Sequence, residues 1–336
     1  MSHSRSARPP LFVDDDLLRR AFATPSVSLL RGATPLDEMS RLRIALGGGP
    51  RLFVKRDDAI PFGFGGNKVR KLEIVGAAAL AADADTLVTV GGVQSNHARA
   101  TAALAAKLGL HCLLIINGKP PERLAANALL DALLGAEVEY IGSREERAPA
   151  AQAALARLRQ QGRTPFLVPL GASTPLGAVG FVRAIGEMLQ QIPAPDVIVH
   201  ASSSGGTQAG LVAGCALYGL PTRVIGVSAD DPASVIAGKV GDIIEGVGDL
   251  LSANAHFAAA TAVVVEEGFV GGGYGIPSDA SREAQRMVAR SEAIFVDHTY
   301  TAKALAAMIA YIRAGRFQDD ETVLFWHTGG QVGLFA

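Results

Sequence analysis

The sequence predicts an α/β fold in which parallel strands are covered by helices on both faces. Short apolar runs alternate with alanine-rich stretches along most of the 336 residues, and this alternation is typical of parallel sheets. Hydrophobic residues make up 49% of the chain and charged residues 19%, which indicates a folded globular protein. Neither an internal repeat nor a Pro/Gly/Ser linker divides the sequence, so any second domain is expected to be an insertion.

The apolar runs define the expected strands, which are 52–55, 86–90, 111–116, 138–141, 165–168, 197–200, 223–227 and 322–325. The stretches between them contain good helix formers and define the expected helices, which are 67–82, 95–108, 125–134, 148–161, 178–191 and 207–217. Strands and helices of this length and order support the α/β prediction.

Charge and composition exclude several classes of function. A formal net charge of -1 argues against an electrostatic footprint for nucleic acid or an anionic membrane. Cys112 and Cys215 lie in apolar runs and are expected to be buried and free, and no metal-ligand spacing is present. The N-terminus lacks a signal-peptide core and no apolar run reaches the ~20 residues of a membrane span, so we expect a cytoplasmic protein.

The first chemically informative segment is GGNKVRKLE, which follows the strand-like run RLFVKRDD. Two glycines allow a tight turn, and Asn67 is expected to cap the helix that begins with Lys68. The positive end of the helix, with Arg70 and Lys71 nearby, should lower the pKa of Lys68. A lysine with a lowered pKa suits Schiff-base formation, because only the neutral amine attacks an aldehyde. A solvated basic face is the plainer interpretation of this segment alone.

The second segment is VGGVQSNHARATAAL, in which an expected strand ends in two glycines before a helix. Ligands of parallel sheets bind at the carboxyl ends of strands, where loops enter helices. The consecutive polar residues Gln94, Ser95, Asn96 and His97 are therefore expected to hold a carboxylate or a ring substituent there. An ordinary helix cap with surface polar residues remains the alternative.

The third segment, VIVHASSSGGTQAG, resembles a phosphate cradle at a strand end. Small residues let backbone N–H groups converge on an anion, and Ser203, Ser204 and Thr207 add hydroxyls. The segment matches neither GxxxxGK[ST] nor GxGxxG, which makes a nucleotide-dependent enzyme the weaker hypothesis. A flexible turn without a ligand is the alternative.

Near the C-terminus, Tyr274 lies in GGGYGIP, Tyr300 precedes a helix start, and a strand ends at Thr328 in HTGG. Either tyrosine could be a core aromatic. A lysine, a phosphate loop and polar strand ends in one chain are best explained by one ligand that carries both a phosphate and an aldehyde.

The segments GGNKVRKLE, GGVQSNHARATAALAAKLGL, SGGTQAG, GGGYGIP and HTGG, in this order, resemble the D-cysteine desulfhydrase and 1-aminocyclopropane-1-carboxylate deaminase family of pyridoxal-phosphate enzymes. The resemblance extends from about residue 52 to the C-terminus. It implies the fold of the tryptophan synthase β subunit (pyridoxal-phosphate fold type II), with two domains that each have a mostly parallel twisted sheet. Residues 1–81 and 175–336 would form the large domain, 82–174 the inserted one, and two chains a homodimer.

The resemblance also implies the site residues. Lys68 would be the Schiff-base lysine and, with Ser95, Tyr274 and Tyr300, catalytic. The cofactor pyridoxal 5'-phosphate would be bound by Lys68, Asn67, Lys71, Asn96, Ser203, Ser204, Gly205, Gly206, Thr207 and Thr328, with Thr328 facing the pyridine nitrogen. The substrate would be bound by Ser95, Asn96, His97, Tyr274 and Tyr300.

Two positions favour the desulfhydrase-like branch of the family. The deaminases carry an acid directly after the second tyrosine and an apolar residue before the last Gly-Gly, where this chain has Thr301 and Thr328. A neutral hydroxyl at the pyridine nitrogen suits the loss of a good β leaving group. The resemblance therefore implies α,β-elimination, with D-cysteine giving pyruvate, sulfide and ammonia.

Three alternatives stay open. Two are enzymes of the same class, a 1-aminocyclopropane-1-carboxylate deaminase and an L-cysteate sulfo-lyase. The third is a catalytically silent module that binds a phosphorylated metabolite. The exact substrate, its chirality and its leaving group are left open by the sequence, as is a competing β-replacement.

Overall fold

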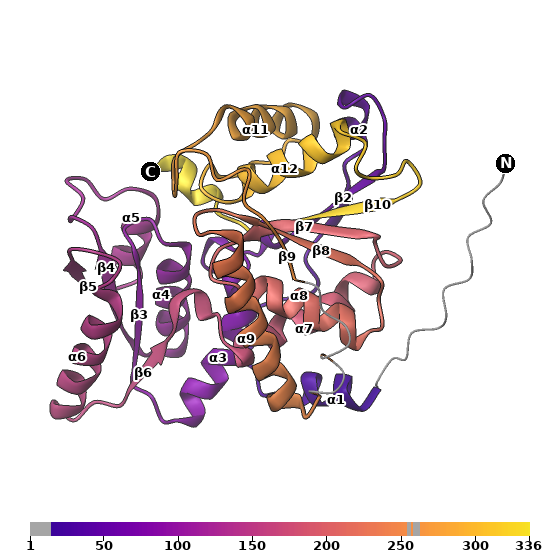
Figure 1. Ribbon diagram of the computed structural model, residues 1–336. Coiled ribbons are helices and arrows are strands. Elements are labelled where there is room, and N and C mark those ends of the chain that lie inside the picture. Colours follow the sequence, from indigo (N-terminus) through magenta and orange to yellow (C-terminus); the bar gives the residue numbers. More distant parts are fainter. Residues whose placement is uncertain (1–14, 254–256, 258–262) are drawn as a thin grey trace.

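The computed structural model describes residues 15–253, 257 and 263–336, which form an α/β structure with two sheets (Figure 1). The six-stranded sheet has the order β1-β2-β10-β7-β8-β9, and the four-stranded sheet has the order β5-β4-β3-β6. Within the six-stranded sheet only β1 runs antiparallel to its neighbour, and all pairs of the four-stranded sheet are parallel. The predicted fold class is confirmed.

The strands of the six-stranded sheet come from both ends of the chain. They are β1 (Leu36–Glu38), β2 (Arg51–Arg56), β7 (Val197–Ser202), β8 (Arg223–Ser228), β9 (Val264–Glu266) and β10 (Thr322–His327). The central strands β10 and β7 are almost entirely buried, as expected for parallel strands covered on both faces.

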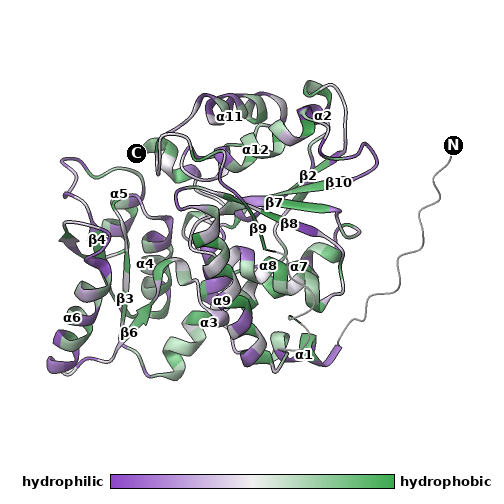
Figure 2. Ribbon diagram, viewed as in Figure 1, coloured by the Kyte–Doolittle hydropathy of each residue, from purple (hydrophilic) through white to green (hydrophobic). Residues whose placement is uncertain are grey.

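Helices cover both faces of this sheet. One face carries α1 (Asp15–Ala23), α7 (Pro175–Leu189), α8 (Gly206–Leu217) and α9 (Ala233–Leu251). The other face carries α2 (Ser40–Ala45), α11 (Asp279–Glu292) and α12 (Thr301–Arg313). In Figure 2 the strands between these two layers are mostly hydrophobic, which agrees with the two apolar clusters on either side of the sheet.

The four-stranded sheet is formed by one continuous stretch between β2 and β7. Its strands are β3 (Thr86–Gly92), β4 (His111–Asn117), β5 (Glu137–Ile141) and β6 (Pro165–Val168). One face packs on α3 (Lys68–Ala81) and α4 (Asn96–Leu108), and the other on α6 (Arg147–Gln160), while α5 (Ala126–Leu133) lies beside α4. Helix α3 also packs against α7, so it contacts the helices of both sheets.

The structure confirms all eight predicted strands and all six predicted helices, with ends that differ by at most three residues. Helices α1, α2, α9 and α11, and the edge strands β1 and β9, were not predicted, and of α12 only the start near Tyr300 was. Helix α9 is informative because ASVIAGKVGDIIEGVGDLL contains glycines that lower its intrinsic helix propensity. Its buried Ile and Val side chains stabilise it by packing against α7 and α8.

Short 3-10 turns complete the described structure, at Asp57–Ala59, Phe62–Phe64, Leu170–Ala172 and Gln331–Phe335. Cys112 and Cys215 are buried and free, as predicted, and burial raises the pKa of each thiol to about 12. Among the described residues no helix combines the length and hydropathy that a membrane span requires.

Candidate active site

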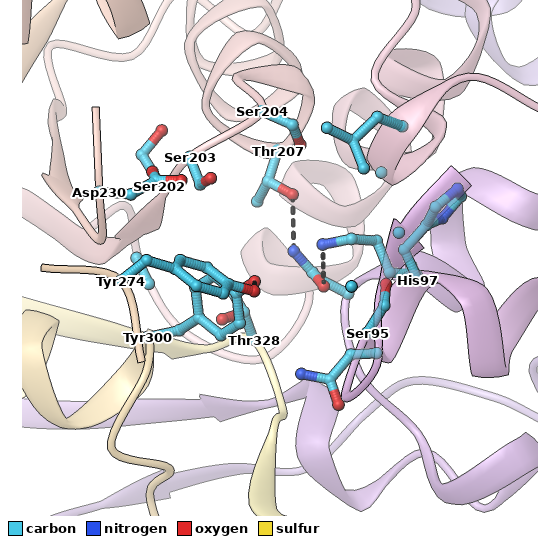
Figure 3. Close-up of a pocket in the computed structure, with 18 of the residues that line it drawn as sticks. Ser95, His97, Ser202, Ser203, Ser204, Thr207, Asp230, Tyr274, Tyr300 and Thr328 are labelled. Atoms are coloured by element: carbon cyan, nitrogen blue, oxygen red, sulfur yellow. Dashed lines mark hydrogen bonds between the residues drawn. The ribbon is translucent and has the colours of Figure 1, made fainter. Parts of the chain in front are cut away.

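A cavity lies where the carboxyl ends of strands from both sheets meet. Gly92 ends β3, Asn117 ends β4, Ser202 ends β7, and all three line the cavity. It brings together most of the predicted site residues, which are Asn67, Lys68, Ser95, Asn96, His97, Ser203, Ser204, Gly205, Thr207, Tyr274, Tyr300 and Thr328. Of the predicted residues, Lys71 and Gly206 lie behind this lining. In Figure 3 the serines of the third segment lie above the tyrosine pair, with Ser95 and His97 on the opposite side.

Lys68 begins α3 and extends its amine into the cavity. Its Nζ donates to Oδ1 of Asn67 at 3.0 Å, and Nδ2 of Asn67 donates to Oγ1 of Thr207 at 2.9 Å (dashed lines in Figure 3). The prediction that Asn67 caps the helix with its side chain is wrong, because its backbone is already helical and its amide makes no capping bond. The amide instead connects the lysine to Thr207 in the first turn of α8.

The pKa of Lys68 is lowered to about 8. Burial of the ammonium is the main cause and the nearby Arg99 guanidinium adds to it, whereas Asp297 opposes the shift. The predicted direction is confirmed, but Arg70, one of the two neighbours invoked from the sequence, is not among the causes. Arg70 points away from the cavity and forms ion pairs with Asp57 at 2.8 Å and Glu187 at 2.9 Å.

This pKa predicts how fast the cofactor-free protein reacts with an aldehyde at different pH values. Because only the neutral amine attacks, the rate should rise about tenfold per pH unit below pH 8 and level off above it. Absorbance after mixing with pyridoxal phosphate measures the rate. A rate that kept rising toward pH 10.5, the ordinary lysine pKa, would contradict the lowered value.

Backbone contacts hold the Lys68 loop against the last strand of the chain. The N–H of Gly66 donates to the carbonyl of Asp57 at 2.8 Å, and the N–H of Asn67 donates to the carbonyl of Thr328 at 2.9 Å. Gly329 must be glycine, because a Cβ there would lie 2.6 Å from Cα of Gly66. The GGNK and HTGG segments are therefore in direct contact, and Thr328 lies beside Lys68.

Gln94, Ser95 and Asn96 follow one another at the turn from β3 into α4, but their side chains make different contacts. Oγ of Ser95 caps α4 by accepting from the N–H of Ala98 at 3.1 Å, and Oδ1 of Asn96 accepts from Nδ2 of Asn127 at 2.9 Å. The Gln94 side chain binds the N–H of Asn127 and is not part of the lining, so its predicted role at the ligand is wrong.

His97 is almost fully buried beside the cavity. Its Nε2 lies 2.7 Å from Oγ1 of Thr89, and its Nδ1 has no partner among the described residues. Burial, together with Lys68 and Lys71, lowers the pKa of His97 well below its usual value, so the ring is neutral. A neutral imidazole can accept or donate one hydrogen bond here but adds no positive charge.

The segment before α8 has the geometry of an anion-binding loop. The helix starts at Gly206 after Gly205, whose φ of +82° strongly favours glycine, and its first N–H groups are free of intrahelical partners. Behind the loop, Ser173 connects three groups: it lies 2.7 Å from Oγ of Ser204, accepts from the N–H of Gly206 at 3.2 Å, and accepts from Nζ of Lys71 at 3.1 Å.

Tyr274 and Tyr300 form a pair with hydrogen-bonded hydroxyls and ring centroids 5.7 Å apart. Burial and the neighbouring Tyr274 raise the pKa of Tyr300 well above its usual value, so its hydroxyl stays protonated. The carboxylate of Asp297 fixes the turn before α12 by accepting from the N–H groups of Thr299, Tyr300 and Thr301 at 2.9 Å each. Lys303 donates to the carbonyl of Gly273 at 2.8 Å and so holds the loop that carries Tyr274.

Sequence reasoning missed several residues that line or support the cavity. Asn117 ends β4 and Asp230 follows β8, and the strand-end rule that found Ser95 would have found both. Asp297 carries a capping signal, because it is an Asp four residues before Thr301, the first residue of α12. Arg144 and Arg147 also line the cavity, but nothing in their local sequence indicates a ligand.

A lysine of lowered pKa, an anion-binding loop and a tyrosine pair in one α/β cavity define an enzyme that binds a phosphorylated aldehyde. The chain belongs to the family of pyridoxal-phosphate dependent enzymes, whose family model matches residues 27–329. The predicted family and cofactor are thereby confirmed.

Individual relatives are similar over almost the whole chain. A D-cysteine desulfhydrase of Salmonella typhi is 37% identical over 320 residues, which cover 93% of this chain and 96% of the relative. The crystal structure of an ACC deaminase homologue superposes with a TM-score of 0.88 at 33% identity and covers 95% of this chain and 96% of its own. Maize serine racemase, at 19% identity and a TM-score of 0.67, covers 94% of both chains and shares the fold.

The residues present fit pyridoxal phosphate. Lys71 is fully buried, and within the described part of the chain no carboxylate lies within ion-pair distance of it. Burial and the nearby Lys68 lower the pKa of Lys71 well below its usual value. A phosphate bound at the loop before α8 would supply the negative charge that this buried amine lacks, and Lys68 would hold the aldehyde.

Proposed function

We propose that this chain catalyses α,β-elimination from a small amino acid, with D-cysteine as the first substrate to test, giving pyruvate, sulfide and ammonia. The observation that carries the proposal is the position of Lys68, whose amine of lowered pKa lies in one cavity with the anion loop and the tyrosine pair. The identity to D-cysteine desulfhydrases over nearly the full chain supports the choice of substrate.

The chain's residues would bind the cofactor at its phosphate, at its aldehyde and ring hydroxyl, and at its pyridine nitrogen. The loop of Ser203, Ser204, Gly205, Gly206 and Thr207 holds the phosphate, assisted by Lys71. Lys68 would hold the aldehyde carbon, Asn67 and Asn96 would bind the ring hydroxyl, and Thr328 would bind the pyridine nitrogen. Bound pyridoxal phosphate supplies an electron sink for the electron pair left when the Cα–H bond breaks.

The side chains of the protein orient the substrate and transfer protons. Ser95 and Asn96, with the free N–H groups at the start of α4, orient the substrate carboxylate, and His97 supports them. Nζ of Lys68 removes the Cα proton as general base. The hydroxyls of Tyr274 and Tyr300 remain protonated and hold a proton near the leaving group. The overall reaction consumes one water and releases ammonia and the 2-oxo acid.

Product analysis with the purified enzyme tests this function. D-cysteine should give equal amounts of pyruvate, sulfide and ammonia. Formation of 2-oxobutyrate from 1-aminocyclopropane-1-carboxylate would favour the deaminase, and sulfite from L-cysteate would favour the sulfo-lyase. A protein that bound pyridoxal phosphate but turned over none of the three would favour the silent binding module.

Replacement of Lys71 by methionine should weaken cofactor binding but increase the stability of the cofactor-free protein. Loss of one charge-assisted hydrogen bond to the phosphate should weaken cofactor binding about 10- to 100-fold. Because the variant removes a buried amine that has no carboxylate partner among the described residues, the cofactor-free protein should become more stable. Titration with pyridoxal phosphate and thermal unfolding measure the two effects. Unchanged cofactor affinity would show that Lys71 does not serve the phosphate.

We further propose that residues 1–81 with 175–336 and residues 82–174 are the two domains, and that the enzyme is a cytoplasmic homodimer. The four-stranded sheet, which lies within 86–168, supports the domain division. The dimer and the location rest on the family resemblance.

A further inference from the structure

Arg147 is a cation at the cavity for which the proposed function has no role. It begins α6 beside the four-stranded sheet, and its Nε and Nη2 both donate to Oδ1 of Asn117, with Nε at 2.9 Å. These bonds fix the guanidinium and leave Nη1 without a hydrogen-bond partner within the described residues. No carboxylate of the described chain lies within ion-pair distance of Arg147.

The neighbouring arginine is already neutralised. Nη2 of Arg144 lies 3.3 Å from Oδ2 of Asp230, and this ion pair connects the loop after β5 to the loop after β8. Arg144 and Asp230 both line the cavity, so their charges cancel at its edge. Arg147 therefore contributes the excess positive charge on this side.

Arg147 also lies close to the groups proposed to act on the leaving group. Burial and Arg144 lower the pKa of Arg147, while Tyr274, Tyr300 and Asp230 are near enough to favour its charged form. A partly desolvated guanidinium attracts an anion more strongly than one in water. Ser95 and Asn96, the residues proposed for the substrate carboxylate, belong to a different loop, before α4.

We propose that Arg147 binds the β-substituent of the substrate as an anion, so that the enzyme selects three-carbon amino acids whose β-substituent is a thiolate or a sulfonate. This inference rests on the proposed elimination and specifies its leaving group. Arg147 contacts the substituent, and Asn117 orients the guanidinium.

The chemistry balances with water alone. The Cα proton goes to Nζ of Lys68, the bond from Cβ to sulfur breaks, and both of its electrons leave with sulfur. A sulfonate departs as sulfite without a further proton, whereas a thiolate takes one proton from the hydroxyl pair of Tyr274 and Tyr300 and departs as hydrosulfide. The negative charge on the departing group grows next to Arg147, which stabilises it. Hydrolysis of the remaining three-carbon fragment gives pyruvate and ammonia, and no oxidant or reductant is required.

The first test measures binding without turnover. Calorimetric titration of the holoenzyme compares 3-sulfopropanoate, which lacks an amine and cannot react, with propanoate, which lacks the second anion. Wild type should bind 3-sulfopropanoate about 10- to 100-fold more tightly, and Arg147→Gln should bind the two acids equally. Arg157→Gln, a change at an exposed position of the same helix, should behave as wild type.

The second test compares kcat/KM for cysteate, cysteine and β-chloroalanine, each as both enantiomers. In Arg147→Gln, kcat/KM should fall about 10- to 100-fold with the sulfonate or thiol substrate. It should fall clearly less with β-chloroalanine, whose substituent is neutral when it binds and becomes an anion only as it departs. An equal fall in kcat/KM with all three substrates would show that Arg147 binds the α-carboxylate. Unchanged kcat/KM with all three would show that Arg147 binds neither anion. Either result overturns the inference.

The two tests separate this inference from the proposed function. If the wild type turned over none of the amino acids, the elimination would be wrong, whereas the titration would still show whether Arg147 binds a second anion. If the wild type turns over cysteate and Arg147→Gln has a lower kcat/KM for it, the substituent is a sulfonate. The same result with cysteine identifies a thiolate.

Discussion

Replacement of Lys68 by alanine should abolish turnover while the protein stays folded. The variant loses the amine that holds the cofactor aldehyde and removes the Cα proton, so kcat/KM should fall on the order of 10³-fold or more. The side chain lies at the cavity and makes one hydrogen bond, to Asn67, so its loss should cost little stability. Steady-state kinetics on D-cysteine, with circular dichroism for the fold, measures both effects.

Lys107→Ala provides the matched control. Lys107 is exposed near the end of α4 and should be dispensable for turnover. If the Lys68 variant kept activity comparable to the Lys107 variant, Lys68 would not be the catalytic lysine.

Replacement of Asp57 by alanine should give the largest loss of stability. Its fully buried carboxylate accepts hydrogen bonds from Nε of Arg70 at 2.9 Å and from Nε1 of Trp326 at 2.9 Å. Removal of Asp57 leaves the buried Arg70 guanidinium with its ion pair to Glu187 and its hydrogen bond to Thr34, and this loss of one carboxylate should cost about 3–5 kcal/mol. Urea unfolding of the holoenzyme and the variant measures the difference.

Asp57 also contacts the site through its backbone, because its carbonyl, which alanine retains, accepts from the N–H of Gly66 in the Lys68 loop. Asp37→Ala is the control, since Asp37 is exposed and its ion pair with Arg56 at 3.5 Å should contribute about 0–1 kcal/mol. A loss for Asp57→Ala no larger than that for Asp37→Ala would show that the buried network contributes little to stability.

Much of the fold could be predicted because parallel strands have continuous apolar runs. Strands β3, β4 and β7 are buried along nearly their whole length, so their sequences stand out from the alanine-rich helices. Helix α9 was missed because its stability depends on packing against other helices, which the local sequence does not show. The edge strands β1 and β9 have only three residues each, too few for a periodic signal.

Site residues could be predicted where they directly follow a strand. They could not be predicted where their role depends on side-chain contacts with residues far away in the sequence. Ser95, Ser203 and Thr328 each follow a buried strand, and the sheet topology brings those ends together. Asn67 was placed correctly but misassigned as a cap, because its bond to Thr207 spans 140 positions of sequence. Arg147 gives no signal because its role depends on Asn117, Tyr274 and Tyr300, which the fold alone brings near it.

The central claim is that Lys68 covalently holds pyridoxal phosphate, and the visible absorption spectrum tests it most directly when borohydride reduction and peptide mapping follow. The purified protein should be yellow, and the reduced adduct should map to Lys68 in the peptide that contains GGNK. A protein that stays colourless with added pyridoxal phosphate, or an adduct on another lysine such as Lys71, would contradict the account.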